Sequence, residues 1–506
     1  MAGYHVENFG CRASRFDGEA IAANLRHRGL AAAEAQDSAH VVIVNTCSVT
    51  AEADRQARAY LRRVRRQNPD ARIVVTGCYA QRAPEELAAL PEVDAVVGNS
   101  HKSKVADVAL AFALAASPTT PGIRDSFVPL SALVPRVLHD DAFAHFDLAA
   151  LPFAPDAQQT RPNLKVQDGC GNRCSFCIIP TTRGPSRSVP LATCLDNVRR
   201  FVDQEESACG GGKESARGGS KELVLSGINL GRWGRDLQPT QRFEDLVAAI
   251  LRTTALPRLR LSSIEPMDWS PDLLALYREY AAGASSAPLN AERCALSARL
   301  PPAPCTPHPR LARHAHLPLQ SGSDAILRRM HRRYRPWHYA ERLAAIRALL
   351  PDAAIGADVM IGFPGETDAL FQESYDFIAA QPFTYLHLFP FSARPGTPAW
   401  ELHRQQPVPP RAVQERLAAL RALMADKFRA FRQPFIGRTL SSVTMETGAD
   451  GTTDAMSDNF LRLSLTTPGG APIPDNRLVA ARITALTPDG LAGTLASPES
   501  ASASIH

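Results

Sequence analysis

A short loop with three cysteines constrains this 506-residue chain more than any other feature of its sequence. Cys170, Cys174 and Cys177 form the pattern C-x3-C-x2-C, beside Gly169 and Gly171. Three thiolates at this spacing can each bind one corner of a [4Fe–4S] cube, which leaves the fourth iron open to a substrate or cofactor. Structural zinc is the alternative, but it normally takes four ligands from repeated C-x2-C pairs, and no second close pair lies nearby. The loop therefore favours an iron–sulfur cluster.

Three further cysteines each follow a predicted strand near the N-terminus. Apolar runs separated by helical patterns at 18–27 and 53–66 predict three short parallel strands, Tyr4–Asn8, Val41–Asn45 and Ile73–Thr76. Cys11, Cys47 and Cys78 come directly after these strands. Because the strands of a parallel sheet all end at one edge, where ligands bind, the three thiols can converge. Each cysteine alone could be a small packed side chain, but three equivalent positions favour a shared metal.

The segment from 161 to 433 repeats strand-then-helix units, which is typical of an open, partial (βα)6 barrel. The predicted strands are Leu164–Gln167, Glu222–Ser226, Arg258–Ser263, His314–Leu319, Ala354–Ile361 and Tyr385–Phe391. The predicted helices are Phe243–Thr253, Pro271–Tyr280, Ser323–Arg332, Trp337–Leu349, Asp368–Ala380 and Arg411–Phe431. Chemistry in such barrels lies at the carboxyl ends of the strands, and Cys170 follows the first strand. We therefore expect the three-cysteine loop at the mouth of the barrel.

Changes in composition along the chain indicate an α/β protein with three domains. We expect an N-terminal parallel α/β domain, a linker, the partial barrel, a small β-barrel and a tail, at 1–115, 116–160, 161–433, 434–498 and 499–506. The small barrel is predicted from four short strands, Thr439–Glu446, Phe460–Thr466, Leu478–Leu486 and Leu491–Leu495. Barrels of this kind often bind oligonucleotides.

Two stretches rich in small and polar residues interrupt the central pattern, near 205–220 and 281–309. Such composition predicts flexible surface insertions. The remaining cysteines have neither strand-end placement nor metal-ligand spacing. We therefore predict that they bind no metal: Cys194, Cys209, Cys294 and Cys305.

Charge and composition indicate where the protein is located and what kind of partner it binds. No run of about 18 apolar residues and no signal-peptide pattern occur, so we expect no membrane association. Ten cysteines without the layout of a small secreted domain indicate a reducing cytosol. The net charge is only +5, but arginines crowd three segments, 55–66, 328–335 and 429–438. One such cluster could be a solvated helix face, whereas three favour a polyanionic partner.

Five motifs make the chain similar to the methylthiotransferases, a family of radical S-adenosylmethionine (SAM) enzymes. They are Asn45-Thr46-Cys47, Thr76-Gly77-Cys78-Tyr79-Ala80-Gln81, Cys170-Gly171-Asn172-Arg173-Cys174-Ser175-Phe176-Cys177-Ile178-Ile179-Pro180, Leu317-Pro318-Leu319-Gln320-Ser321-Gly322-Ser323 and Asp358-Val359-Met360-Ile361-Gly362-Phe363-Pro364-Gly365-Glu366-Thr367. The domain order also resembles that family, whose C-terminal barrel is of the TRAM type. The resemblance covers almost the whole chain, and the two insertions depart from it.

Within this family, the chain is most similar to the branch that modifies N6-threonylcarbamoyladenosine (t6A) in tRNA. The similarity rests on Phe9-Gly10-Cys11-Arg12, on 45–54 and on Ser226-Gly227-Ile228-Asn229-Leu230-Gly231. It implies conversion of t6A at tRNA position 37 to the 2-methylthio derivative. The other branches act on isopentenyl-adenosine in tRNA or on a ribosomal-protein aspartate, and both remain alternatives. An RNA-binding protein with structural iron–sulfur clusters and no turnover is a third alternative.

The resemblance also implies two [4Fe–4S] clusters and SAM as both radical source and methyl donor. Cys170, Cys174 and Cys177 would hold the cluster that cleaves SAM, and the resulting radical would remove hydrogen from C2 of the adenine. An auxiliary cluster carrying the inserted sulfur would be held by Cys11, Cys47 and Cys78. The expected SAM contacts lie at or beyond strand ends: Ser226, Gly227, Glu265, Gln320 and Gly362.

The implied partners are the tRNA anticodon stem-loop, whose single-stranded bases can be splayed out, and a cytosolic electron donor. We expect the helix that carries Arg55–Arg66 to contact phosphates, together with Arg438, Arg477 and Arg482 of the C-terminal barrel. We further expect a monomer in the cytoplasm.

Overall fold

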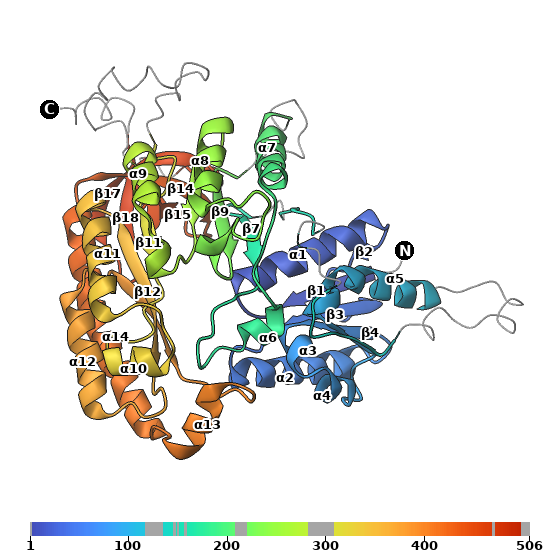
Figure 1. Cartoon of the computed structure of the whole chain (residues 1–506). Helices are drawn as coiled ribbons and strands as arrows, with labels where there is room; N and C mark the ends of the chain where they lie inside the picture. The colour runs from blue at the N-terminus through green and yellow to red at the C-terminus, as the bar shows by residue number, and fades with distance from the viewer. Residues whose placement is uncertain are drawn as a thin grey trace, which may run out of the picture.

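The computed structural model places the chain in an N-terminal, a central and a C-terminal region that pack together (Figure 1). The residues that it describes are 3–116, 135–144, 148, 151–155, 159–207, 220–281, 308–467 and 471–496. Most of the expected linker and insertions, and the whole tail, lie outside these residues, as do Cys209, Cys294 and Cys305.

The N-terminal region is a parallel sheet with strand order β2-β1-β3-β4-β5-β6. β1 (Gly3–Asn8), β3 (Val41–Thr46) and β4 (Arg72–Gly77) confirm the three predicted strands. The other strands are too short for a hydrophobic pattern to predict: β2 (Ala31–Ala32), β5 (Ala95–Gly98) and β6 (Val137–Leu138). β6 pairs with β5, so the segment expected to be a linker contributes a strand to this sheet.

Helices cover both faces of this sheet (Figure 1). The clusters of buried residues place α1 (Arg12–His27) and α5 (Val105–Ala116) on one face, and α2 (Ala51–Gln67), α3 (Cys78–Arg82) and α4 (Pro84–Ala88) on the other. α1 begins six residues before its predicted start because its first turns bury polar side chains, which a hydrophobic pattern does not register. α5 was not predicted from the sequence, and its apolar side chains belong to the core.

The central region is an open barrel made of two sheets, β10-β9-β7-β8 and β11-β12-β13. All six predicted strands are confirmed, with bounds β7 (Asn163–Asp168), β9 (Glu222–Gly227), β10 (Arg258–Leu261), β11 (His314–His316), β12 (Ala354–Ile361) and β13 (Tyr385–Pro390). They pair in parallel, and short β8 (Arg187–Ser188) adds antiparallel to β7. β11 ends before its predicted end, although Leu317 and Leu319 still donate to the carbonyls of Gly356 and Asp358 on β12, at 2.9 and 3.1 Å.

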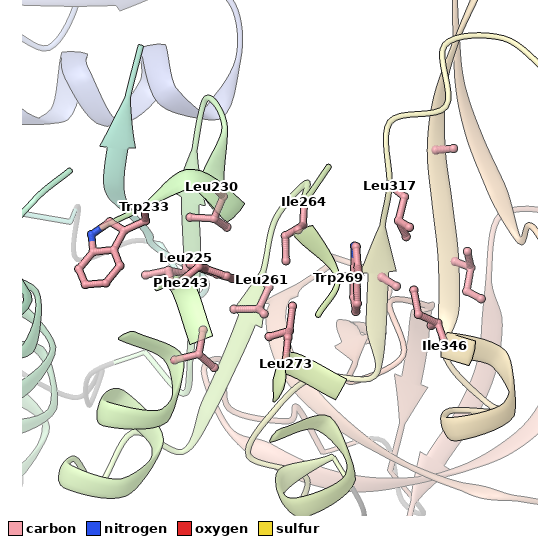
Figure 2. Close-up of a cluster of buried hydrophobic side chains, with 14 of the residues drawn as sticks. Leu225, Leu230, Trp233, Phe243, Leu261, Ile264, Trp269, Leu273, Leu317 and Ile346 are labelled. Atoms are coloured by element: carbon pink, nitrogen blue, oxygen red, sulfur yellow. The ribbon is translucent and has the colours of Figure 1, made fainter. Parts of the chain in front are cut away.

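Helices pack around the outside of this barrel, over a continuous apolar core (Figure 2). They are α7 (Leu191–Ser207), α8 (Phe243–Thr253), α9 (Pro271–Tyr280), α10 (Asp324–Arg329), α11 (Pro336–Leu349), α12 (Asp368–Ala380), α13 (Pro398–Gln405) and α14 (Pro410–Arg432). The short α6 (Ile179–Arg183) lies instead against α3 of the N-terminal region. α10 stops three residues before its predicted end, because His331 adopts a φ of 57° and Arg332 turns inward. No helix in the described ranges is long and apolar enough to cross a membrane.

The C-terminal region is a closed barrel in which the strands neighbour one another in the order β14-β15-β16-β18-β17. Four strands were expected here, and the fifth, β15, has too little apolar alternation to predict. The strands are β14 (Thr439–Thr447), β15 (Thr453–Ser457), β16 (Arg462–Thr466), β17 (Leu478–Leu486) and β18 (Leu491–Leu495). Closure leaves this barrel without an exposed sheet edge.

The C-terminal barrel contributes an aromatic ring to the inside of the central barrel. The Phe460 ring lies 4.4 Å from the ring of His314 and 5.4 Å from that of Tyr385, measured between centroids. The guanidinium of Arg260 lies 5.3 Å from the Phe460 ring and donates to the carbonyl of Ser457 at 2.9 Å. The two barrels therefore share one packed floor.

Acid is expected to destabilise the contact between the two barrels through Glu222, whose carboxylate is fully buried. Burial alone raises the pKa of Glu222, but Arg161 and Arg260 outweigh it and hold the pKa well below its usual range. Its contribution is therefore complete above about pH 4.3 and disappears as the pH falls toward the depressed folded value. We expect Glu222→Gln to lower the free energy of unfolding by about 2–3 kcal/mol at pH 7. In urea titrations this difference should shrink below about pH 4, and a pH-independent difference would contradict the assignment.

Candidate functional site

The first site lies at the edge of the N-terminal sheet where three neighbouring strands end. β1, β3 and β4 are adjacent in the sheet, and Cys11, Cys47 and Cys78 follow them. Cys47 and Cys78 are buried, whereas Cys11 is exposed at the N-terminus of α1. The thiol of Cys47 interacts electrostatically with both others, so the strand ends bring the three sulfur atoms together.

Two glycines allow this convergence. Gly10 has a φ of +109°, and a Cβ there would lie 2.8 Å from the Cβ of Cys47. Gly77 has a φ of +98°, and a Cβ there would lie 2.3 Å from the carbonyl oxygen of Thr46. Both positions need the left-handed conformation and the missing side chain, which other residues cannot supply without strain.

Gly77→Ala is therefore expected to lower the free energy of unfolding by about 2–3 kcal/mol, from strain at positive φ and from the clash with Thr46. Thermal unfolding measures this effect. Gly29→Ala is the matched control, because Gly29 also has a positive φ but its added Cβ would meet nothing within 4 Å. Equal losses in the two variants would show that crowding at Thr46 contributes nothing.

Polar groups surround these sulfur atoms. Asn99 Nδ2 donates to Cys78 Sγ at 3.6 Å and to the carbonyl of Thr182 at 2.7 Å. Ser14 Oγ lies 3.8 Å from Cys11 Sγ. Burial raises the pKa of Cys47 to about 12, so its thiol stays protonated near neutral pH unless a bound metal replaces the proton. Such a set of sulfur ligands suits a soft metal centre.

The second site is the loop after β7. Gly169, with a φ of +73°, turns the chain out of the strand, and the amide of Cys170 donates to the carbonyl of Gly184 at 3.0 Å. Burial raises the pKa of Cys170, and raises that of Cys177 to about 12. The thiols of Cys170 and Cys174 both interact electrostatically with Cys177. The structure thus brings the second predicted cysteine set together.

Three hydrogen bonds reach the sulfur atoms of this loop. The amide of Asn172 donates to Cys170 Sγ at 3.4 Å, and Asn229 Nδ2 donates to the same atom at 3.5 Å. Arg332 Nη1 donates to Cys174 Sγ at 3.4 Å. Hydrogen bonds of this kind stabilise the negative charge of a metal-bound thiolate and tune its metal. The sequence does not predict the roles of Asn229 and Arg332, although Asn229 does lie just beyond the end of β9.

A pocket opens beside Cys174. It is lined by Asn172, Arg173, Cys174, Arg232, Glu265, Met267, His331, Arg332, Arg333 and Tyr334. Glu265, expected to contact SAM, faces this pocket, and its Oε2 accepts a hydrogen bond from Arg332 Nη2. A small polar ligand in this pocket would therefore meet both a thiol and a charged pair.

The other expected SAM contacts have different surroundings. Ser226 Oγ and Gln320 Oε1 are buried and have no hydrogen-bond partner among the described residues. Gln320 also adopts a φ of 67°, a conformation that favours glycine and is found mainly where function requires it. Gly362 has a packing reason for being glycine, because an added Cβ would lie 2.5 Å from Val413 of α14. Gly227 packs on Gln167 in the same way.

Comparisons with known proteins support the predicted family. A family model described as "Uncharacterized protein family UPF0004" matches residues 3–98, which include the first cysteine set. The threonylcarbamoyladenosine tRNA methylthiotransferase MtaB of Bacillus subtilis is 30% identical over 92% of this chain and 90% of its own length. The MtaB protein of Aquifex aeolicus is 32% identical over 87% of this chain and 92% of its own.

The chain belongs to the methylthiotransferase family of radical SAM enzymes. A tRNA-2-methylthio-N(6)-dimethylallyladenosine synthase of Cereibacter sphaeroides is also 30% identical, over 96% of this chain and 97% of its own. Among solved structures, the radical SAM methyltransferase TsrM of Kitasatospora setae is 13% identical, with a TM-score of 0.49 over 80% of this chain and 75% of that chain. This overlap is too weak to add to the sequence matches.

A buried ion network joins the two cysteine sites of this methylthiotransferase. Asp17 of α1 binds Lys102 and Lys165, and Arg183 Nη1 donates to Asp17 Oδ2 at 3.2 Å. Arg183 also donates to both oxygens of Asp168 at 3.0 Å, two residues before Cys170. On the side of the N-terminal sheet, Arg183 interacts electrostatically with Cys78 and Cys11. Both sites therefore border one set of charges, which the sequence pattern does not reveal.

A second polar group lies inside the barrel of the methylthiotransferase. His387 Nδ1 lies 3.2 Å from Asp358 Oδ1, and His316 Nε2 lies 3.6 Å from the same oxygen. Ser263 Oγ holds the other ring nitrogen of His316 at 2.8 Å. Burial lowers the pKa of His316 to about 4 although Asp358 opposes this, so the ring is neutral near pH 7.

The three arginine clusters of the methylthiotransferase differ in how much charge they leave exposed. In the segment 328–335, Arg332 does not add to an exposed basic cluster, because it is buried against Cys174 and Tyr334. Arg65 binds backbone carbonyls and Asp94, and Arg438 pairs with Asp352. The exposed arginines in the segments expected to bind phosphate are Arg55, Arg62, Arg63, Arg66, Arg438, Arg477 and Arg482, of which Arg55 pairs with Glu52 and Arg438 with Asp352.

Proposed function

We propose that this chain converts t6A at position 37 of tRNA to its 2-methylthio derivative. The relatives named MtaB match about nine-tenths of this chain and of their own lengths, which supports the t6A substrate. The observation that carries the proposal is the pairing of two three-cysteine sites across one ion network. A single cluster would suffice for SAM cleavage alone, whereas inserting sulfur needs a second metal site.

The residues present fit two iron–sulfur clusters and SAM. Cys170, Cys174 and Cys177 would hold the cluster that binds SAM, and the sulfur atoms of Cys170 and Cys174 already accept N–H donors. The auxiliary cluster would be held by the set at the strand ends: Cys11, Cys47 and Cys78. Each set offers three thiols, which leaves one iron of each cluster for a non-protein ligand.

Bound together, these groups would supply an electron to cleave SAM, a radical to remove the C2 hydrogen of adenine, and a sulfur and a methyl group to replace it. The protein's own part is to hold and orient SAM. Ser226 Oγ and Gln320 Oε1 are buried polar atoms without a hydrogen-bond partner among the described residues, and Glu265 lines the pocket beside Cys174. These three side chains are proposed to fix SAM, with Gly227 and Gly362 shaping the walls.

We infer that the substrate is the anticodon stem-loop of tRNA, bound in the cytoplasm. The exposed face of α2 and the C-terminal barrel are proposed to contact its phosphates, through Arg62, Arg63, Arg66, Arg477 and Arg482. Phosphate contacts of this kind give affinity that falls with salt but depends little on base sequence. The electron is proposed to come from a cytosolic donor, and the chain to act as a monomer.

Nucleoside mass spectrometry tests this function. tRNA is isolated from a host that lacks the activity and expresses either this chain or its Cys174→Ala variant. We expect 2-methylthio-t6A with the unaltered chain and none with the variant. A methylthio group on dimethylallyladenosine instead would move the chain to the branch of the Cereibacter relative, which is also 30% identical. An unmodified tRNA pool in a host that assembles both clusters would exclude both and leave the ribosomal-protein substrate.

A further inference from the structure

An arginine of the N-terminal region lies at its border with the central barrel. Arg12 is the first residue of α1 and directly follows Cys11. Its carbonyl oxygen accepts a hydrogen bond from Asn163 Nδ2 at 3.1 Å, which fixes the start of α1 against the first residue of β7. Figure 1 shows α1 beside β7. The exposed side chain of Arg12 therefore leaves the N-terminal region where it meets the barrel.

The guanidinium of Arg12 lies within electrostatic range of groups inside the barrel. It interacts with Tyr385 and Glu222, and it also influences His316. His316 and Tyr385 stand on β11 and β13, and their rings are stacked with 5.9 Å between centroids. Arg12 thus places a positive charge beside the barrel interior, next to the auxiliary cysteine site.

No carboxylate in the part of the chain that the structure describes forms an ion pair with Arg12. Glu222 is already bound by Arg260 at 2.7 and 2.9 Å and by Arg161 at 2.7 Å. Asp358 contacts His316 and His387 instead, Asp168 pairs with Lys165 and Arg183, and Glu265 pairs with Arg332. The charge of Arg12 is therefore available to an anionic ligand that enters the barrel.

The position of Arg12 relates this free charge to the substrate. If the proposed function holds, the reacting adenine must lie within reach of the auxiliary cluster, one of whose ligands is the preceding residue, Cys11. The threonylcarbamoyl group on N6 of that adenine ends in a carboxylate, whereas a dimethylallyl group carries no charge. Arginine binds carboxylates in a two-pronged, charge-assisted geometry.

We propose that Arg12 binds the carboxylate of the N6-threonylcarbamoyl group and thereby selects t6A over adenosines with a neutral N6 substituent. A neutral substituent would leave the guanidinium unpaired in a partly desolvated setting, so it would bind less well. The residue acts on substrate choice, and the chemistry at C2 does not involve it.

The test compares two synthetic anticodon stem-loops, one with t6A at position 37 and one with its carboxamide, which has the same shape but no charge. For the unaltered enzyme with both clusters, we expect kcat/KM to be about 10- to 100-fold higher for the acid than for the carboxamide. Arg12→Gln should reduce this ratio to near one, and Arg12→Lys should retain part of it. The Kd of each RNA, measured without reductant, should show the same preference.

The ratio within each variant separates substrate choice from damage to the neighbouring cluster, because a loss of cluster lowers both rates equally. Arg15→Gln is the matched control, since Arg15 is an exposed arginine on the same helix that pairs with Glu19 on the surface. An unchanged acid preference in Arg12→Gln would overturn the role of Arg12 and leave the proposed function intact. Failure of the unaltered enzyme to modify t6A in either assay would overturn both.

Discussion

Replacing Cys174 with alanine is expected to reduce SAM cleavage and methylthio transfer to background. Two thiols would remain in the loop, Cys170 and Cys177, and two ligands do not retain a [4Fe–4S] cube. Iron bound per chain should fall by about four atoms, and the matching electron paramagnetic resonance signal should disappear. The measurements are 5′-deoxyadenosine formation under anaerobic, reducing conditions and iron content.

Two other cysteine variants make this result specific. Cys194→Ala removes a thiol that is buried in the apolar core, where it donates to the carbonyl of Val189, so iron content and SAM cleavage should be retained. Cys78→Ala should retain SAM cleavage but yield no methylthio product, because only the auxiliary site loses a ligand. Product formation by Cys174→Ala, or equal loss of SAM cleavage in all three, would refute the separate roles of the two sets.

Asp17→Asn is expected to lower the free energy of unfolding by about 3–5 kcal/mol. Asp17 is fully buried and binds Lys102, Lys165 and Arg183. Burial alone raises the pKa of Asp17, but these three cations outweigh it and lower the pKa, so the carboxylate is charged in the folded protein. The amide would leave three buried cations to share Asp168. The first transition in a urea titration at pH 7 measures the loss.

Asp107→Asn is the matched control for Asp17→Asn. Asp107 also belongs to the N-terminal region and pairs with Arg28, but both side chains are substantially exposed. Exposed pairs contribute little, so the change should stay within about 0.5 kcal/mol. Similar losses in the two variants would show that the buried network contributes no more than a surface pair. Proteolytic separation of the N-terminal region should also increase in Asp17→Asn alone.

The sequence predicts the long elements well and the short ones poorly. β12 and α8 are continuous apolar or amphipathic runs whose pattern alone decides their type, and both match their predicted bounds. β5 and β15 are short, and pairing on both sides holds them in place, β5 between β4 and β6 and β15 between β14 and β16. α1 differs again, since its first two turns bury Ser14 and Asp17, whose partners lie on other elements and cannot be predicted from the local sequence.

The same distinction applies to the site. The cysteines could be found because their spacing, or their place after a strand, is visible in the sequence. Arg332 is a site residue that could not be found in this way. In the sequence it is one member of a basic cluster, but in the structure the positive φ of His331 turns it inward to Cys174. Asn99 and Arg183 likewise act through the tertiary fold, which brings them to sulfur atoms from other parts of the chain.

The position of the Phe460 ring limits where the C-terminal domain of such an enzyme can be exchanged for another. A small C-terminal domain is often treated as an appendage that can be removed or exchanged at its connecting peptide. In this chain the C-terminal barrel packs into the base of the central barrel, because the Phe460 ring contacts those of His314 and Tyr385 and Arg260 donates to the carbonyl of Ser457. A chimaera joined at residue 434 with a foreign module would open that base to water. A functional chimaera would need to keep both Phe460 and its partner Arg260.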